Sequence, residues 1–97
     1  MPIIRMIHVT FPPDLAASAE ADWKEKCAPL MIRQKGCLSE QLLRCASKPG
    51  EYISYSEWQD EASIQQYLAG ADHQEIKRTT RNITGATVMV KHYEAVG

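Results

Sequence analysis

The order of strands and helices that the sequence predicts constrains its fold more than any single motif does. Four runs rich in β-branched or aromatic residues indicate strands: Ile3 to Phe11, Cys37 to Cys45, Tyr52 to Trp58, and Thr87 to Val96. Pro12-Pro13 ends the first run, and Ser47-Lys48-Pro49-Gly50 indicates a turn between the second and third. One turn and two longer stretches therefore separate the four predicted strands.

The first of the longer stretches has the apolar spacing of a helix. Asp14 is placed to cap its start. The apolar face is formed by residues at helical spacing: Leu15, Ala19, Trp23, Cys27, and Leu30 or Met31. Pro29 lies late in this helix, where we expect it to kink the helix or loosen its last turn. Gly36 is the predicted C-terminal cap.

The second stretch predicts two helical pieces. Apolar residues at helical spacing mark the first piece: Ala62, Ile64, Tyr67 and Leu68. Gly70 ends this piece, and Asp72-His73-Gln74-Glu75 then has the form of a capping box, in which the Asp72 side chain accepts from the backbone N–H of Glu75. A short second helix is predicted to about Ile83, and Asn82 to Gly85 breaks the pattern before the last strand.

The resulting order is strand, helix, strand, strand, helix, strand. This split βαβ order predicts an α+β fold with a four-stranded antiparallel sheet and both helices on one face. Both sheet faces are partly apolar, since the first strand places Ile7 and Val9 on one face and Ile4 and Met6 on the other. The helices can cover only one face, and an apolar face left in water favours association. We therefore expect a homodimer, formed sheet against sheet through the open face.

Composition argues against several classes of protein. The 11 Lys and Arg residues against 12 Asp and Glu give a net charge of −1, without the clustered basic charge of a nucleic-acid surface. The longest apolar run, Ala28 to Ile32, is far shorter than a membrane span, and Met1 to Arg5 lacks the features of a secretory signal. Cys27, Cys37 and Cys45 form no Cys-x-x-Cys pair, which favours neither a disulfide framework nor a zinc site. We expect a cytoplasmic protein that binds neither nucleic acid nor membrane.

Two segments around the third strand resemble the antibiotic biosynthesis monooxygenase superfamily. Tyr55-Ser56-Glu57-Trp58-Gln59-Asp60-Glu61-Ala62 has the family's strand ending in Trp followed by an acidic-Ala helix start. Tyr67-Leu68-Ala69-Gly70-Ala71-Asp72-His73 then places a His fifteen residues after that Trp. The strand opening at Gly36 and the ending Val90 to Val96 fit the same pattern. Because the resemblance covers nearly the whole chain, we expect residues 1–97 to form one domain of this kind.

The resemblance implies a ferredoxin-like βαββαβ protomer that packs its sheet against that of a second copy, in a dimeric α/β barrel. It also implies a pocket in each protomer, between the sheet and the helices. Some members of the superfamily oxygenate polyketide phenols, anthrones or quinols with dioxygen and use neither metal nor flavin. Others bind and degrade heme.

The sequence departs from the heme-degrading branch at three places. That branch has an Asn in the middle of its first strand, where this chain has Ile7 and His8. In the heme-degrading branch a Trp in a helix would align near Tyr67 of this chain, and the His that binds heme would align near Ile76 or Lys77. This chain has neither the Trp nor the His at these positions. The resemblance therefore disfavours heme degradation. Since the sequence also contains no Gly-rich phosphate loop, we expect no cofactor.

His73 and Tyr67 are the catalytic candidates. His73 could take a proton from a phenolic substrate near neutral pH, and the helix dipole at its position would help to keep its ring neutral. Tyr67 could orient a substrate oxygen or donate to a developing anion. Both residues also have a plain structural interpretation: His73 as a solvated residue in the first turn of a helix, and Tyr67 as a core residue with a wet hydroxyl.

Four further residues are candidates for contact with an aromatic substrate: Trp58, Trp23, Tyr55 and His8. Core packing alone would also explain the two tryptophans. His8 and His92 belong to strands expected to be antiparallel neighbours, so we expect their imidazoles to come close. No motif supplies a third ligand at a suitable spacing, and a metal site is not predicted.

Three functions stay open on this basis. The first is a monooxygenase without metal or flavin that oxidises a small electron-rich aromatic, with His73 as base and Tyr67 assisting. The second is a non-catalytic binding or stress-response protein that holds a small hydrophobic ligand in the same dimer. The third is an isomerase or lyase on the same scaffold, which turnover independent of oxygen would separate from the first.

Overall fold

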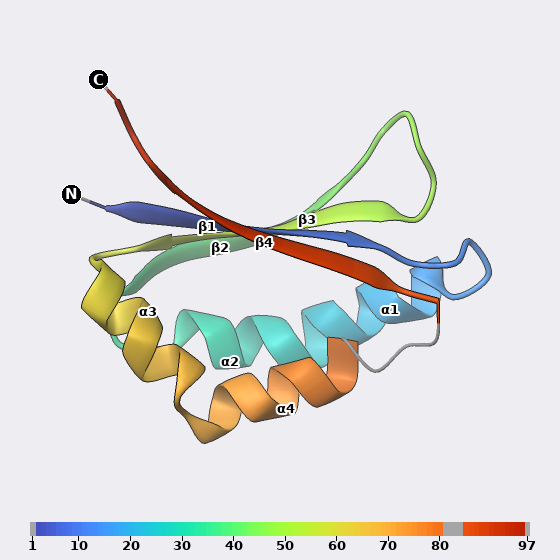
Figure 1. The fold of residues 1–97 in the computed structure, drawn as a ribbon. Helices are drawn as coiled ribbons and strands as arrows, with labels where there is room; N and C mark the ends of the chain where they lie inside the picture. The colour runs from blue at the N-terminus through green and yellow to red at the C-terminus, as the bar shows by residue number, and fades with distance from the viewer. Residues whose placement is uncertain (1, 81–84, 97) are drawn as a thin grey trace.

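A four-stranded antiparallel sheet covers one side of a layer of helices (Figure 1). The structure, a computed structural model, describes residues 2–80 and 85–96. The sheet has the spatial order β2-β3-β1-β4, and its strands are β1 (Ile3–Thr10), β2 (Cys37–Arg44), β3 (Glu51–Trp58) and β4 (Thr87–Glu94). The helical layer contains α1 (Ala16–Asp22), the π-helical segment η1 (Trp23–Cys27), α2 (Ala28–Ile32), α3 (Glu61–Leu68) and α4 (Ala71–Thr80). This arrangement confirms the predicted ferredoxin-like α+β fold.

The strand register decides which side chains face the helices. Arg5 and Val9 of β1 lie directly opposite Ser56 and Tyr52 of β3, and all four side chains are buried. The face that these residues share is therefore the covered face of the sheet, and the alternate residues form its open face. Met89 and Tyr93 of β4 belong to the open face and are exposed, at 53% and 42%.

The first helix does not begin where its sequence predicts. Its start is a backbone turn in which the N–H of Leu15 donates to the carbonyl of Pro12 at 2.9 Å. Leu15 occupies the cap position, where no side-chain hydrogen bond is made, and Asp14 is exposed. The prediction of Asp14 as the cap is wrong, because the turn after the two prolines carries the chain into the helix. Leu15 is also exposed, so the buried stripe begins at Ala16.

Pro29 has the predicted loosening effect on this helix. In η1 the N–H of Ala28 donates to the carbonyl of Trp23, five residues earlier instead of four. A proline lacks an N–H and crowds the carbonyl four residues before it, and the wider turn accommodates both. Pro29 then lies in the first turn of α2, where a missing N–H has no cost.

Gly36 is not the C-terminal cap that the sequence indicates. Helix α2 ends at Ile32, and Gly36 lies in the turn that leads into β2, with a φ of +87°. Its carbonyl accepts from the N–H of Gln59 at 2.7 Å, which connects the start of β2 to the end of β3.

Asp60 caps a helix, α3, whereas Asp72 does not act as the predicted cap. Oδ1 of Asp60 accepts from the backbone N–H of Ser63 at 2.8 Å at the start of α3. Asp72 already lies inside α4, and its carboxylate accepts from Arg33 at 2.8 and 3.0 Å and from Gln34 at 2.6 Å. The predicted capping box is therefore wrong, because residues at the end of α2 bind the carboxylate. The predicted helix end near Ile83 and the break from Asn82 lie outside the described residues.

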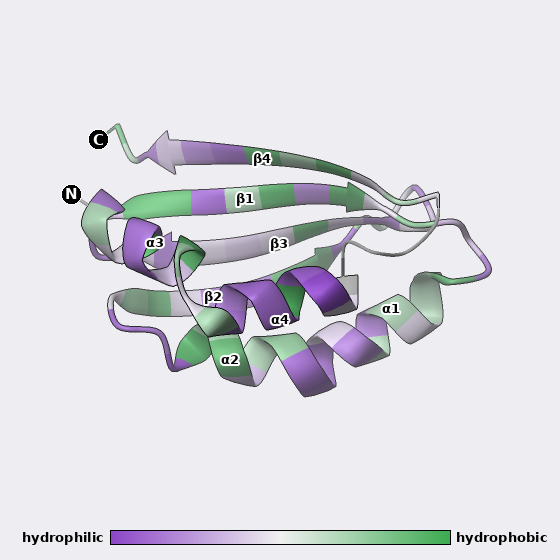
Figure 2. Cartoon of the chain, turned by 60° about the horizontal axis from the view of Figure 1, so that its bottom comes forward, coloured by the Kyte–Doolittle hydropathy of each residue, from purple (hydrophilic) through white to green (hydrophobic). Residues whose placement is uncertain are grey.

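The buried side chains form two clusters beneath the sheet. The first cluster consists of Cys27, Met31, Trp58, Ile64, Tyr67 and Ile76. The second consists of Val9, Phe11, Ala16, Ala19 and Tyr52. Helix α4 is hydrophilic along most of its length (Figure 2), and it turns His73 and Ile76 inward. Within the described ranges, no helix is long and apolar enough to cross a membrane.

Candidate active site

A cavity lies between the sheet and the helices, where the two buried clusters meet. It contains about 560 Å³ that no protein atom fills, part of it open to solvent. The residues that line it come from the covered face and from the inner sides of the helices: Ile7, Val9, Phe11, Ala19, Trp23, Met31, Leu42, Ser54, Tyr67, Ile76 and Val88. The lining is largely apolar, and its hydroxyl groups belong to Ser54 and Tyr67. Such a cavity suits a small aromatic or aliphatic ligand.

Tyr67 connects this cavity to a group of buried polar and aromatic residues. Its ring stacks on Trp58 at 5.2 Å between centroids and meets the ring of His73 edge-on at 5.0 Å. The guanidinium carbon of Arg5 lies 5.9 Å from the centre of the same ring. All four side chains are buried. The structure thus brings the two catalytic candidates, Tyr67 and His73, into contact.

His73 is held in one tautomer by the end of α3. Its Nδ1 lies 3.1 Å from the carbonyl oxygen of Leu68. A carbonyl oxygen only accepts, so Nδ1 carries the hydrogen and, in the neutral ring, Nε2 carries the lone pair. His73 is 7% exposed and is not part of the cavity lining, which is formed on this side by Tyr67. The interpretation of His73 as a solvated surface residue is therefore wrong.

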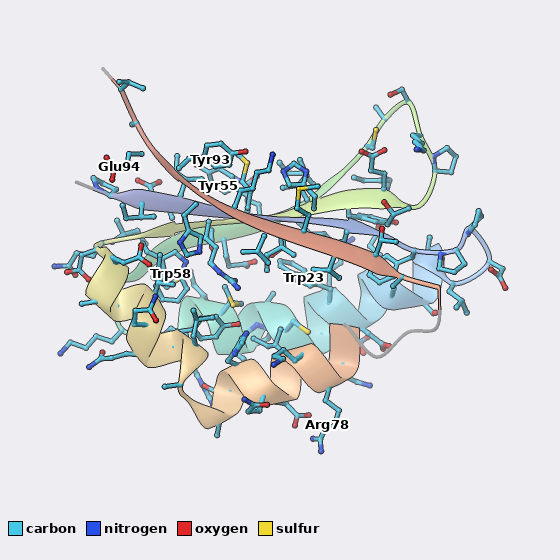
Figure 3. The ribbon with its side chains drawn as sticks, in the orientation of Figure 1. Trp23, Tyr55, Trp58, Arg78, Tyr93 and Glu94 are labelled. Carbon is cyan, nitrogen blue, oxygen red and sulfur yellow. The ribbon has the colours of Figure 1, made fainter. Side chains whose placement is uncertain are left out.

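The four residues predicted to contact the substrate lie on two different sides of the sheet, and Figure 3 labels three of them. Trp23 lines the cavity, and Trp58 lies behind Tyr67 with its indole N–H donating to Ser56 Oγ at 2.8 Å. Tyr55 lies on the open face, where Figure 3 shows it on the side of the sheet away from the helices. His8 shares that face, opposite Met89. Tyr55 and His8 are thus placed away from the cavity of their own chain.

His8 and His92 do not come together as the sequence indicates. His92 is paired with Arg5 and so lies on the covered face, whereas His8 lies on the open face. The partner of His92 is Glu61, whose Oε1 lies 3.6 Å from its Nδ1. In the part of the chain that the structure describes, no three His, Cys, Asp or Glu side chains converge as metal ligands.

Sequence reasoning missed a polar row that crosses the covered face. One residue from each strand contributes to it, in register: His92, Arg5, Ser56 and Glu40. Arg5 is 3% exposed, and burial raises the pKa of Glu40 above its ordinary value. The signal was present in the first strand, where the alternation places Arg5 on the same face as Ile7 and Val9.

The cysteines are all free thiols. Cys27 is fully buried in the first cluster, and burial raises the pKa of its thiol to about 11. A thiol in that state is a poor nucleophile, in agreement with the interpretation of Cys27 as a small core residue.

The family model for antibiotic biosynthesis monooxygenases matches residues 2–79. The chain belongs to this family. A comparison with curated proteins gave no match. Among solved structures, a Bordetella bronchiseptica protein with the same family name has a TM-score of 0.86 at 23% identity, over 98% of this chain and 97% of that one. SnoaB from Streptomyces nogalater, a cofactor-independent oxygenase, has a TM-score of 0.78 at 20% identity, over 99% and 94%. At these identities the structural likeness establishes the fold of this antibiotic biosynthesis monooxygenase family member.

Proposed function

We propose that this protein is a cofactor-free monooxygenase that oxidises a small electron-rich aromatic, such as a phenol, anthrone or quinol, with dioxygen. One observation carries the proposal: in a chain of this family, the apolar cavity has Tyr67 in its wall and a tautomer-fixed His73 directly behind it. The fold shared with SnoaB, a cofactor-independent oxygenase, supports the same activity.

The reaction needs only the substrate and dioxygen. A deprotonated aromatic gives one electron to dioxygen, and the resulting pair combines to a hydroperoxide. Loss of water then leaves a carbonyl, so the substrate loses two hydrogens and gains one oxygen atom, and the second oxygen atom leaves as water. The protein contributes orientation, a base and a site from which water is largely excluded.

Each candidate residue has a role in this scheme. Tyr67 presents its hydroxyl to the substrate oxygen, and Trp23 forms part of the wall against the aromatic ring. His73 lies behind Tyr67 and outside the cavity lining, so in this scheme it serves as the base by way of the Tyr67 hydroxyl, through Nε2, the ring atom left with the lone pair when Nδ1 donates to Leu68. Trp58 holds the ring of Tyr67 in place by stacking on it.

We also propose that the protein works as a homodimer in the reducing cytoplasm, where its thiols stay free. The open face of the sheet carries the exposed apolar side chains of Leu43, Met89 and Tyr93, at 39%, 53% and 42%. A second copy packed against this face would cover them. Tyr55 and His8 would then lie at the seam between two chains.

Dioxygen uptake by the metal-stripped protein, with a panel of anthrones, naphthols and quinols, tests the activity. We expect uptake above the uncatalysed rate, and we expect His73→Phe to lose most of it while circular dichroism and thermal unfolding show an intact fold. Tyr93→Phe, which alters an aromatic residue on the open face, is the control and should keep full activity. Full activity in His73→Phe would rule out His73 as the catalytic base.

A binding protein without catalysis is the second candidate, and the composition of the cavity favours it. Among the described residues of the lining, Ser54 and Tyr67 are the two with hydroxyl groups, and the others are suited to holding an apolar ligand. A tight aromatic ligand that copurifies and stays unchanged under air would favour this candidate over the oxygenase.

A further inference from the structure

The edge strand β4 presents an apolar surface beside the cavity. It is the outermost strand on one side of the sheet, and all eight of its residues are exposed (Figure 2). Two of them, Val88 and Val90, belong to the covered face, because they lie opposite Val9 and Ile7 of β1. Val88 and Val90 are each 40% exposed, whereas Val9 is buried. The helical layer therefore covers β1 more fully than it covers β4.

This apolar surface is continuous with the cavity. Val88 belongs to the cavity lining, and so do Val9 and Ile7, the partners of Val88 and Val90. Residues paired across two antiparallel strands have their side chains about 5 Å apart, so Val90 adjoins the cavity floor at Ile7. We call Val88 and Val90 together the valine strip. Part of the cavity is open to solvent, and the valine strip extends its lining toward the edge of the sheet.

The valine strip ends at a polar pair. The next residue of β4 on the same face is His92, whose Nδ1 lies 3.6 Å from Oε1 of Glu61 at the start of α3. Successive residues on one face of a strand are about 6–7 Å apart, so the strip offers a short aliphatic surface before this pair. Neither valine side chain has a charge or a hydrogen-bonding group. The strip therefore suits a short saturated hydrocarbon chain.

We propose that the valine strip is a second subsite of the cavity, which holds an unbranched alkyl chain attached to the aromatic ligand. The ring lies in the cavity against Trp23, and the chain passes Val88 and lies on Val90. This deepens the proposed function, on which the aromatic ring of the ligand rests, and narrows the substrate class to alkyl-substituted hydroxyaromatics. The binding free energy comes from the apolar area of the chain and of the two valines that is removed from water.

The test is isothermal titration calorimetry under nitrogen with 4-ethylphenol, 4-butylphenol and 4-hexylphenol, which differ in chain length alone. Full burial of a methylene group raises affinity about fourfold, and a chain on an exposed strip is buried on one side, so we expect about twofold for each methylene. The affinity should therefore rise at least about tenfold from 4-ethylphenol to 4-hexylphenol. Equal affinities, weaker binding of 4-hexylphenol, or no binding of any of the three would overturn the proposal.

Two threonine variants of β4 assign this gain in affinity to the valine strip. Val90→Thr keeps the branched shape of the side chain and places a hydroxyl group on the strip, so the gain from ethyl to hexyl should fall about threefold. Met89→Thr is the matched control, because it puts the same residue at an exposed position of the open face, and it should leave the gain unchanged. Both positions are exposed, so both variants should fold. Equal gains in the two variants would overturn the role of the strip.

A second copy of the chain is the other occupant of the valine strip that these variants can reveal. Val90→Thr would then weaken the homodimer in sedimentation equilibrium and leave the affinity gain from ethyl to hexyl as it is in the wild type. That result would overturn the alkyl subsite.

The alkyl subsite and the proposed function fail in different ways. An affinity gain with chain length that depends on Val90, without any dioxygen uptake, would keep the alkyl subsite and remove the monooxygenase. Dioxygen uptake without such a gain would keep the monooxygenase and remove the alkyl subsite.

Discussion

Tyr67 is the residue at which the cavity and the buried polar group meet. Its ring is fixed by Trp58 on one face and by the edge of His73, and Arg5 lies near its centre. A ring held in this way loses little freedom when a substrate binds, so its hydroxyl is preorganised. This gives the hydroxyl group of Tyr67 a larger expected role in the reaction than in the stability of the fold.

Tyr67→Phe should therefore lower kcat while the protein stays folded. Loss of one preorganised donor toward a developing anion costs about tenfold or more in rate. The stacked ring remains, so the free energy of unfolding should change by less than about 1 kcal/mol. Steady-state dioxygen uptake and urea unfolding measure the two quantities. An unchanged kcat in Tyr67→Phe would show that the hydroxyl group of Tyr67 takes no part in the mechanism.

Glu20 is a residue whose charge stabilises the fold away from the cavity. Arg44 donates to both of its carboxylate oxygens at 2.8 Å, which holds the pKa of Glu20 at about 2 against the opposing effect of burial. A carboxyl whose pKa is lowered on folding adds stability that is complete above its unfolded pKa near 4.5 and is lost as the pH falls toward 2.

Glu20→Gln should lower Tm at pH 7 by about 2–5 °C, because an exposed ion pair contributes up to about 1 kcal/mol in a domain of this size. The difference from wild type should shrink as the pH falls from about 5 toward 2, since Glu20 in the wild type then becomes neutral. Thermal unfolding at several pH values measures this. A Tm difference that is constant with pH would exclude the charge as its cause.

At the scale of elements, periodicity predicts strands and helices well, whereas caps depend on contacts that are distant in sequence. The alternation of the strands and the 3.6-residue spacing of the helices depend on local residues alone, and the predicted order is confirmed. Asp72 has the local sequence of a cap, but Arg33 binds its carboxylate from 39 residues away. The loosening at Pro29 was predictable, because it follows from the proline ring itself.

The candidate site was also predictable only in part, because local sequence patterns indicate some of its residues and the pairing of distant strands determines the others. The short break between the two helical pieces allowed His73 to fold back on Tyr67, and both were singled out. The alternation along β3 separates two of the predicted substrate contacts: Trp58 and Tyr55 are three residues apart, so they lie on opposite faces. Residue type alone does not predict the burial of Arg5, because arginine is ordinarily exposed, although its position in the alternation of β1 places it on the buried face.

Gly36 is the position at which the connection between α2 and β2 depends most on residue type. Its φ of +87° is strained for any other residue, and an added Cβ would come within 2.4 Å of the Cβ of Ser63. Gly36→Ala should therefore lower the free energy of unfolding by about 2 kcal/mol or more.

Gly70→Ala provides the control for that change. An added Cβ there would lie 3.4 Å from its nearest neighbour, the carbonyl oxygen of Tyr67, so we expect a change within about 1 kcal/mol. Urea unfolding of the two variants measures the difference. Equal effects of the two substitutions would show that the backbone conformation at Gly36 has no special cost.

For the molecule as a whole, the proposed homodimer depends on the open face of the sheet. Met89→Asp should place a charge in the sheet-to-sheet contact and convert the dimer to a monomer of 10.9 kDa at micromolar concentration. Ile32→Asp changes a side chain of similar exposure, 51%, on the helical layer, and should leave the dimer intact. Sedimentation equilibrium measures both masses. A wild-type mass of 10.9 kDa would contradict the proposed dimer.

The most direct test of the monooxygenase is the fate of labelled dioxygen. The metal-stripped protein is supplied with ¹⁸O₂ and with the anthrone, naphthol or quinol that gives the fastest uptake. We expect mass spectrometry to find one ¹⁸O atom in the product and the other in water, at a rate above that of the substrate alone. A product without label, or a rate equal to the uncatalysed one across the panel, would contradict the proposed function.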